Sequence, residues 1–212
     1  MNLLTELYRD QNARWPQTGR HILAQYDDDS VIVYQAYRAE IGHFATQHGY
    51  FGGAFSVQRM SWIKPNFLWM MYRCGWGTKE QQEVVLAIRL KRAAFDQVLA
   101  QAVHSSYVAA VYGMEAAWQA AVARSDVRLQ WDPDHHPSGA KLERRAIQLG
   151  LRGEALAHYA KDWIVSIEDI SDFVREQHQR LHAYVLDELI LPREAVYPVT
   201  DPATAAKLGL SA

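Results

Sequence analysis

Cations and large aromatic side chains alternate over one short stretch of the sequence. The residues of these types that could contact a ligand there are Arg59, Trp62, Lys64, Trp69, Tyr72 and Arg73. Arginine binds phosphate through paired hydrogen bonds, lysine acts as a point charge, and aromatic faces stack on bases or on a nicotinamide ring. The alternative is a packed helix with a Trp and Met core stripe and solvated ends, because these residues at helical spacing usually form cores.

The stretch from Arg59 to Arg73 contains no Asp or Glu. Cations close to an apolar wall raise one another's energy unless an anion compensates them. We therefore predict that residues 62–76 form a wall of the main cleft, and that Arg59, Lys64 and Arg73 bind a phosphate-bearing ligand there. Three further arginines stand at the ends of predicted strands and are candidates to join this site, the alternative being a solvated sheet edge: Arg38, Arg144 and Arg145.

A second group of residues has the types that bind metal ions: Asp132, Asp134, His135 and His136. Pro133, Pro137 and Gly139 stand among them, which favours an exposed, solvated loop. We predict that Asp132 accepts hydrogen bonds in a turn before Pro133 and that this loop binds no metal. His178 and His182 lie one helical turn apart, but no carboxylate motif accompanies them.

Composition limits the function classes. The chain has 212 residues, with 22 Lys and Arg against 24 Asp and Glu, so its formal charge is −2 and no global basic field attracts nucleic acid. The single cysteine, Cys74, forms no internal disulfide and favours a reducing compartment. No signal peptide and no apolar run of membrane-spanning length is recognisable. These features predict a cytoplasmic protein without a membrane partner.

Hydrophobic periodicity predicts the elements that position these residues. Strands are expected over residues 31–37, 84–90, 127–131, 146–151 and 163–167, and helices over 39–48, 67–72, 92–103, 153–161 and 173–189. Residues 1–25 are expected to form a peripheral arm or cap, and residues 192–212 a loop-like tail. Strands and helices mix without a strict βαβ rhythm, which favours one α+β domain over residues 1–212, with a mixed or antiparallel sheet flanked by helices.

Longer motifs resemble a known family. The run R-M-S-W-I-K-P-N-F-L-W-M-M-Y-R at 59–73, followed by W-G at 76–77, resembles the hallmark of the domain-of-unknown-function family 4291. The resemblance extends to Y-Q-A-Y at 34–37, V-R-L-Q-W-D-P at 127–133 and R-A-I-Q-L-G-L at 145–151, in matching order over about residues 20–170. The family's name assigns no activity, so this resemblance implies no particular chemistry.

The order of elements also resembles the layout of ADP-ribosyltransferase-like folds. Those folds place an Arg or His on the first strand, a Ser or Tyr on the next, and a Glu late in the chain, around bound NAD. The resemblance implies that Arg38 holds the pyrophosphate or ribose, Ser61 orients the ribose, and Glu143 stabilises an oxocarbenium-like transition state. Trp62 would stack on the nicotinamide. The chain would then be a nucleotide-binding protein with NAD as cofactor, and a transferase if all of these residues share one cleft.

Two other function classes remain open. A non-catalytic binder of RNA or single-stranded nucleic acid would use the same cations and Arg145 for phosphates, with tryptophans as stacking platforms. A scaffold protein would use exposed aromatic residues for partner contacts. A cleft lined by Arg38, Ser61 and Glu143 favours the enzyme, a flat basic and aromatic face favours nucleic acid, and an apolar patch favours the scaffold.

Overall fold

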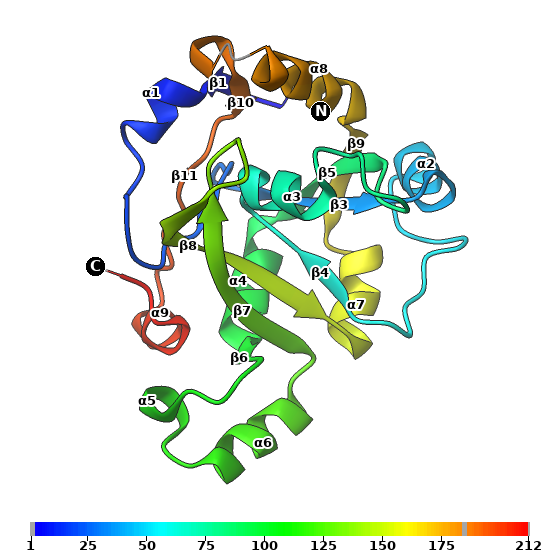
Figure 1. The fold of residues 1–212 in the computed structure, drawn as a ribbon. Helices are drawn as coiled ribbons and strands as arrows, with labels where there is room; N and C mark the ends of the chain where they lie inside the picture. The colour runs from blue at the N-terminus through cyan, green and yellow to red at the C-terminus, as the bar shows by residue number, and fades with distance from the viewer. Residues whose placement is uncertain (1–2, 184–185, 212) are drawn as a thin grey trace.

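The computed structural model describes residues 3–183 and 186–211, and one of its sheets is an antiparallel three-stranded sheet (Figure 1). Its strands are β3 (Ser30–Tyr37), β5 (Val84–Lys91) and β9 (Ile164–Asp169), with β5 in the middle. Apolar residues occupy both faces of β3 and β5, because each face packs against a separate cluster of side chains. This explains why the sequence of β3 is a nearly continuous apolar run rather than an alternating one.

A second sheet diverges from the first. Its order is β4 (Ser61–Ile63), β8 (Lys141–Leu151), β7 (Val127–His135) and β6 (Val103–His104), antiparallel except for the β6–β7 pair. Two backbone hydrogen bonds join the sheets: the Tyr34 N–H donates to the Lys64 carbonyl at 2.7 Å, and the Lys64 N–H donates to the Tyr34 carbonyl at 3.3 Å. Beyond this bridge a side chain joins them, since the Gln35 amide donates to Ser61 Oγ and to the Trp62 carbonyl.

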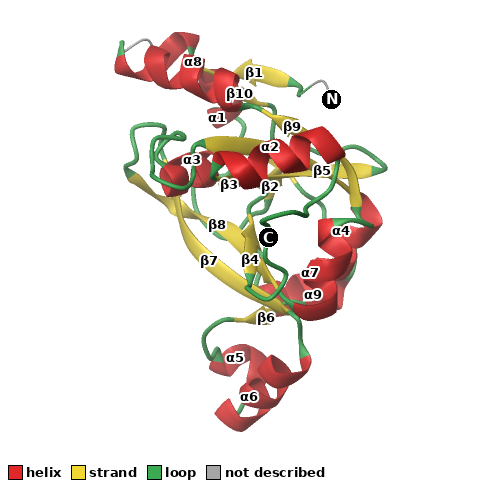
Figure 2. Ribbon diagram, turned by 90° about the vertical axis from the view of Figure 1, so that its right-hand side faces the viewer, coloured by secondary structure: helices red, strands yellow, loops and turns green. Residues whose placement is uncertain are grey.

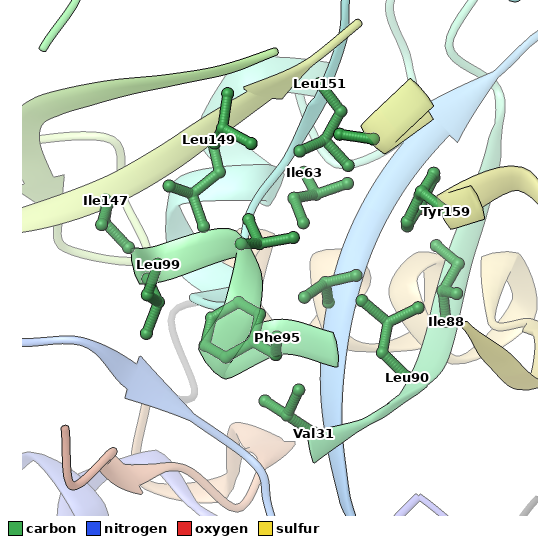
Figure 3. Packing of buried hydrophobic residues seen from close by; sticks show 14 of the residues in the cluster. Val31, Ile63, Ile88, Leu90, Phe95, Leu99, Ile147, Leu149, Leu151 and Tyr159 are labelled. Carbon is green, nitrogen blue, oxygen red and sulfur yellow. The ribbon is translucent and has the colours of Figure 1, made fainter. Parts of the chain in front are cut away.

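The main core fills the angle between the two sheets. Figure 3 shows Val31, Ile88 and Leu90 from the first sheet facing Ile63, Leu149 and Leu151 from the second. The helices α4 (Arg92–Gln101) and α7 (Gly153–Ala160) add side chains to the same core. On the other face of β3 and β5, a second cluster includes side chains from α3 (Phe67–Cys74) and α8 (Ser171–His182). The first sheet is therefore packed on both of its faces.

The remaining elements lie at the periphery. The helix α2 (Ala39–His48) covers one side of the first sheet, as Figure 2 shows, and ends at Gly49, whose φ of 75° is in the left-handed region. The helices α5 (Ala109–Tyr112) and α6 (Glu115–Arg124) project from one end of the molecule in both ribbon views and contain no buried residues. None of the described helices has the length and apolar character needed to cross a membrane.

The two chain ends pack together beside the sheets. The N-terminal segment contains β1 (Thr5–Leu7), α1 (Tyr8–Asn12) and β2 (Leu23–Ala24). The C-terminal segment contains a short 3₁₀ helix (Leu186–Glu188), β10 (Ile190–Pro192), β11 (Ala195–Val196) and α9 (Pro202–Leu208). β1 pairs with β10 and β2 pairs with β11, both antiparallel. The predicted arm is thus held in place by backbone hydrogen bonds to the other end of the chain.

The α+β fold class expected from the sequence is confirmed, and α2 has the predicted bounds. Several predicted bounds need correction, and the strand expected from residue 146 begins at Lys141. The tail after Pro192 is not entirely loop, because Asp201 caps α9 by accepting from the Thr204 N–H at 2.9 Å. β7 does not end before Asp132 but continues to His135. The last predicted helix begins at Ser171 and ends at His182, while residues 184–185 of its predicted span fall outside the described residues.

Candidate anion-binding cleft

A polar cleft lies where the two sheets diverge. Its volume is about 520 Å³, and its lining comes from the end of β3, the strand β4, the cleft-facing side of α3 and the strands β7 and β8. A second hollow of about 400 Å³ adjoins it, sharing Tyr37, Arg59, Met60, Ser61 and Gln82. The two hollows therefore form one elongated depression, within the size range of about 300–1,000 Å³ that is typical of small-ligand sites.

Lys64 is the most buried charged group of this cleft. It follows Ile63, whose side chain anchors β4 in the core, and the backbone bridge to Tyr34 holds it in place. The side chain is 4% exposed, lines the cleft and has no ion pair within the described residues. Burial, helped by the nearby Arg73 guanidinium, lowers the pKa of Lys64 to about 8. At neutral pH the ammonium is therefore charged; the Asp132 carboxylate partly offsets this lowering of the pKa, but no described carboxylate forms an ion pair with Lys64.

Arg59 and Arg73 join Lys64 at the cleft. Arg59 stands in the loop before β4, and Arg73 in the last turn of α3; both side chains are exposed and both line the cavity. The structure thus brings the three predicted cations to one cavity rather than directing them separately to bulk solvent. No Asp or Glu is among the described residues that line it. The Asp132 carboxylate acts on Lys64 from outside this lining, so on the open side of the cleft an anionic ligand would supply the compensating charge.

The N-terminus of α3 is positioned by buried polar contacts. Asn66 caps it, since its side-chain oxygen accepts from the Trp69 N–H at 2.7 Å. The Glu194 carboxylate accepts from the Phe67 N–H at 2.7 Å and from the Asn66 amide at 3.0 Å. Burial raises the pKa of Glu194 well above its usual range. A residue from the C-terminal segment therefore holds the helix that presents Arg73 to the cleft.

Two glutamines form the floor of the cleft, and an aspartate outside its lining accepts hydrogen bonds from both. Gln130 on β7 and Gln148 on β8 are paired directly across the strands, and both line the cavity. Each amide donates to one oxygen of the Asp132 carboxylate, at 2.9 Å from Gln130 and 2.8 Å from Gln148. Asp132 therefore accepts side-chain hydrogen bonds within a strand and does not form the turn that the sequence predicts before Pro133.

Trp62 lies against the backbone of β8. A side chain at Gly150 would meet the Trp62 ring at 3.0 Å and Met60 Sδ at 2.6 Å, so this close contact requires a glycine. Trp62 is partly exposed and borders the cleft. Its ring is therefore the tryptophan available to stack on a ligand at this site.

The structure does not bring Trp69 and Tyr72 to the cleft. Helical spacing turns Met70 and Arg73 toward the cavity, while Trp69 and Tyr72 face the β7–β8 hairpin and stack on His135, whose centroid is 3.5 Å from that of Tyr72. Trp69 and His135 are buried. The two rings predicted to bind ligand thus pack α3 against the hairpin.

The hairpin itself differs from the predicted solvated loop. Asp134 is buried and paired with Arg144 at 2.7 Å. Among the described residues no group of three His, Cys, Asp or Glu side chains could hold a metal ion. His178 and His182 do approach each other, with 3.0 Å between their Nε2 atoms, and His178 stacks on Trp76 beside an apolar cavity of about 480 Å³.

Ser61 and Arg38 lie along the elongated depression. Ser61 lines both hollows, and its Oγ is 2.8 Å from the Gln35 amide nitrogen and 2.8 Å from the Tyr37 hydroxyl. Burial raises the pKa of Tyr37 well above its usual range, so the phenol stays protonated. Arg38 lines only the smaller hollow and forms an exposed ion pair with Glu40 at 3.0 Å.

Glu143 and Arg145 are not brought to the cleft. Side chains on a strand alternate between its faces, and on β8 the cleft face belongs to Gln148 and the other even-numbered positions. Glu143 and Arg145 are exposed, and the Arg145 N–H donates to the Gly19 carbonyl in the N-terminal segment. The late glutamate and the second arginine of the sequence hypothesis therefore lie on the opposite face of this strand.

The sequence interpretation missed the uncharged polar residues of the site. Gln35, Gln130 and Gln148 are single amides inside strands, and they become a constellation only through the pairing of the strands. The alternating pattern of β7 does place Gln130 on the face opposite Leu129. This alternation is the feature of the sequence that could have identified Gln130 as a residue on the cleft face.

Comparison with known proteins agrees with the resemblance found in the sequence. A family model described as Domain of unknown function (DUF4291) matches residues 21–197, which include the cleft and the buried Glu194. No curated protein matches the chain.

Proposed function

The chain belongs to the family described as Domain of unknown function (DUF4291), and we propose that it binds a phosphate-bearing nucleotide in the cleft beside β4 and α3. The observation that carries this proposal is the buried Lys64, which forms no ion pair with the described residues. A buried charge is costly unless it is paired, and a phosphate group supplies the missing charge together with several hydrogen-bond acceptors. Arg59 and Arg73 add two more cationic side chains to the lining of the same cavity.

The shape and remaining lining of the site support a nucleotide rather than phosphate alone. The cleft and its adjoining hollow together extend from Lys64 to Arg38. Trp62 offers a partly exposed aromatic face for a base or a nicotinamide ring. A ligand with a charged centre and a flat ring fits this combination.

NAD is the nucleotide favoured by the ADP-ribosyltransferase-like order of elements. In this proposal Ser61 orients a ribose, and Arg38 contacts the pyrophosphate along the smaller hollow. Glu143, which that resemblance would make the catalytic carboxylate, lies on the opposite face of β8. NAD binding is therefore better supported than ADP-ribosyl transfer. Release of nicotinamide from NAD by the purified protein is the measurement for the transferase part.

Binding of RNA or single-stranded nucleic acid is the second candidate, and the geometry favours it less. The three cations line a hollow rather than a flat face. Trp69 and Trp76, two of its expected stacking platforms, are buried. The formal charge of −2 also lacks the basic excess typical of such proteins.

A thermal-shift series with one substitution and a matched control tests the proposal. NAD, ADP-ribose, ATP, pyrophosphate and a short RNA are each added to the wild type, to Lys64→Met and to Lys91→Met. Lys91 is exposed and pairs with Ser30 at the far end of β5 from the cleft. A ligand at about 100 times its Kd adds about 2.7 kcal/mol, a shift of a few degrees.

We expect nucleotide-induced shifts in the wild type and Lys91→Met, and a much smaller shift in Lys64→Met. The shift is measured relative to each ligand-free variant, because the substitution itself changes stability. Absence of a shift with every nucleotide, or equal shifts in Lys64→Met and the wild type, would contradict the proposal. A shift with RNA alone would support the second candidate.

A further inference from the structure

The floor of the cleft contains hydrogen-bond acceptors whose direction is set by a carboxylate. Gln130 and Gln148 face each other across β7 and β8, and each amide nitrogen donates to a different oxygen of Asp132. An ionised carboxylate can only accept hydrogen bonds, so both amides must turn their nitrogen atoms toward it. Their Oε1 atoms are consequently directed away from Asp132.

A third glutamine of the same cleft shows the contrast. Gln35 donates twice, to Ser61 Oγ and to the Trp62 carbonyl, and its Oε1 accepts from the Tyr159 hydroxyl at 2.6 Å. Its hydrogen-bonding capacity is used within the fold. Among the described residues, no donor forms a hydrogen bond with the Oε1 atoms of Gln130 and Gln148, although both side chains line the cavity. They are available to a ligand.

Oriented acceptors select the part of a ligand that can lie over them. Phosphate oxygens are acceptors themselves and gain nothing from a second acceptor, whereas sugar hydroxyls can donate. The cations Lys64 and Arg73 line the same cavity. A ligand that satisfies both sets carries a phosphate next to a group rich in hydroxyls, which is the chemistry of a ribose phosphate.

We propose that Asp132 is a positioning residue that fixes Gln130 and Gln148 as acceptors for the ribose hydroxyls of the bound nucleotide. This inference rests on the proposed function, because it assigns the sugar position of the same ligand. It makes the cleft selective for ribonucleotides over inorganic pyrophosphate and over nucleotides that lack the sugar hydroxyls.

The test compares ligands and variants in one cycle. ADP, 2′,3′-dideoxy-ADP and pyrophosphate are titrated calorimetrically into the wild type, Asp132→Asn and Gln148→Met. Asparagine at 132 has one acceptor oxygen, so one glutamine amide loses its partner and its direction. Methionine at 148 removes one acceptor at similar size and leaves Asp132 in place. Asp172→Asn, at an exposed position on α8, is the matched control.

We expect the wild type and the control to bind ADP about tenfold more tightly than the dideoxy analogue, since one or two hydrogen bonds are lost. In Asp132→Asn and Gln148→Met this ratio should fall toward one. Pyrophosphate affinity should be unchanged in Gln148→Met, and unchanged or higher in Asp132→Asn, where a negative charge near Lys64 is removed.

The possible failures are distinguishable. A wild type that binds none of the three ligands overturns the proposed function and this inference with it. A wild type that binds ADP and its dideoxy analogue equally overturns the inference alone. So does an equal loss of all three affinities in both floor variants, which would mean that the floor only supports the fold.

Discussion

Two buried cations, Arg144 and Lys64, have opposite surroundings. Arg144 is 1% exposed; its Nε and one terminal nitrogen each lie 2.7 Å from Asp134 Oδ2, and its other terminal nitrogen donates to the Pro16 carbonyl. Its guanidinium also lies over the Trp15 ring, 5.2 Å from the centroid. Lys64 is 4% exposed, and no ion pair is recorded for it within the described part of the chain.

The difference separates a charge that is compensated inside the fold from a charge that, in the proposed function, is compensated by a bound anion. The Arg144 contacts tie the N-terminal segment, through Trp15 and Pro16, to the β7–β8 hairpin. The burial cost of Lys64 is not compensated in the same way within the protein. Substitutions should therefore change different properties at the two sites. Breaking the Arg144 ion pair should lower the stability of the fold, whereas replacing Lys64 should weaken ligand binding.

The largest expected effect follows from removing the ion pair between Arg144 and Asp134. Asp134→Asn leaves Arg144 buried without its counter-charge, which should lower the free energy of unfolding by about 3–5 kcal/mol. Urea denaturation at pH 7 measures this, with Asp172→Asn as the control because its ion pair with Arg175 is exposed. The control should change stability by less than about 1 kcal/mol.

A double substitution extends this test in case Asp134→Asn does not fold. Asp134→Leu combined with Arg144→Met removes both charges and should recover most of the lost stability, because apolar pairs often replace buried ion pairs at little cost. An effect of Asp134→Asn no larger than that of the exposed control would show that Arg144 is not compensated by Asp134, and the comparison with Lys64 would fail.

The next prediction is a gain of stability on replacing Lys64. Burial lowers the pKa of Lys64 from 10.5 to about 8, so between these pH values the unfolded chain holds a proton that the folded chain does not. Wild-type stability should therefore rise with pH across this window, while below pH 8 the full cost of the buried charge remains. Lys64→Met, measured without ligand, should be more stable than the wild type at pH 7 by about 2–3 kcal/mol.

The pH dependence provides the check. The advantage of Lys64→Met should shrink between pH 8 and 10.5 in urea denaturation series, whereas Lys91→Met should follow the wild type throughout. A loss of several kcal/mol in Lys64→Met at pH 7 would mean that Lys64 is compensated inside the fold, and no anion site would then be needed to explain it.

The paired site was harder to predict from sequence than the unpaired one. The cations of residues 59–73 and the absence of acids among them are visible in the sequence. The Arg144–Asp134 pair depends on β7 continuing past Pro133, and proline normally ends such a strand. The register of the β7–β8 pairing shifts between Pro133 and His135. A strand tolerates proline at such a bulge. Local pattern alone did not reveal this bulge.

The helices and central strands were predictable because their signals are local. Apolar spacing and a terminal glycine define α2, and the Asp201–Pro202 pair was an available signal for α9, since aspartate caps helices and proline suits their first position. The cleft required strand pairing as well. Gln130 and Gln148 are eighteen positions apart in sequence but lie opposite each other in the sheet. The type of each residue, taken alone, does not show which residues the strand pairing brings together.

The smallest expected effect is that of replacing Arg73, which lies near Lys64. The Arg73 guanidinium lowers the pKa of Lys64, yet Arg73 itself is exposed, so solvent screens its influence. Arg73→Gln should raise the pKa of Lys64 above about 8 and weaken pyrophosphate binding only a few-fold. Titration of lysine labelled with ¹³C at Cε, followed by NMR, measures the first change. The signal is assigned by its absence in Lys64→Met, and Arg175→Gln on α8 is the control. A lower or unchanged pKa of Lys64 in Arg73→Gln would mean that burial alone sets it, and that the two cations do not act on the same anion.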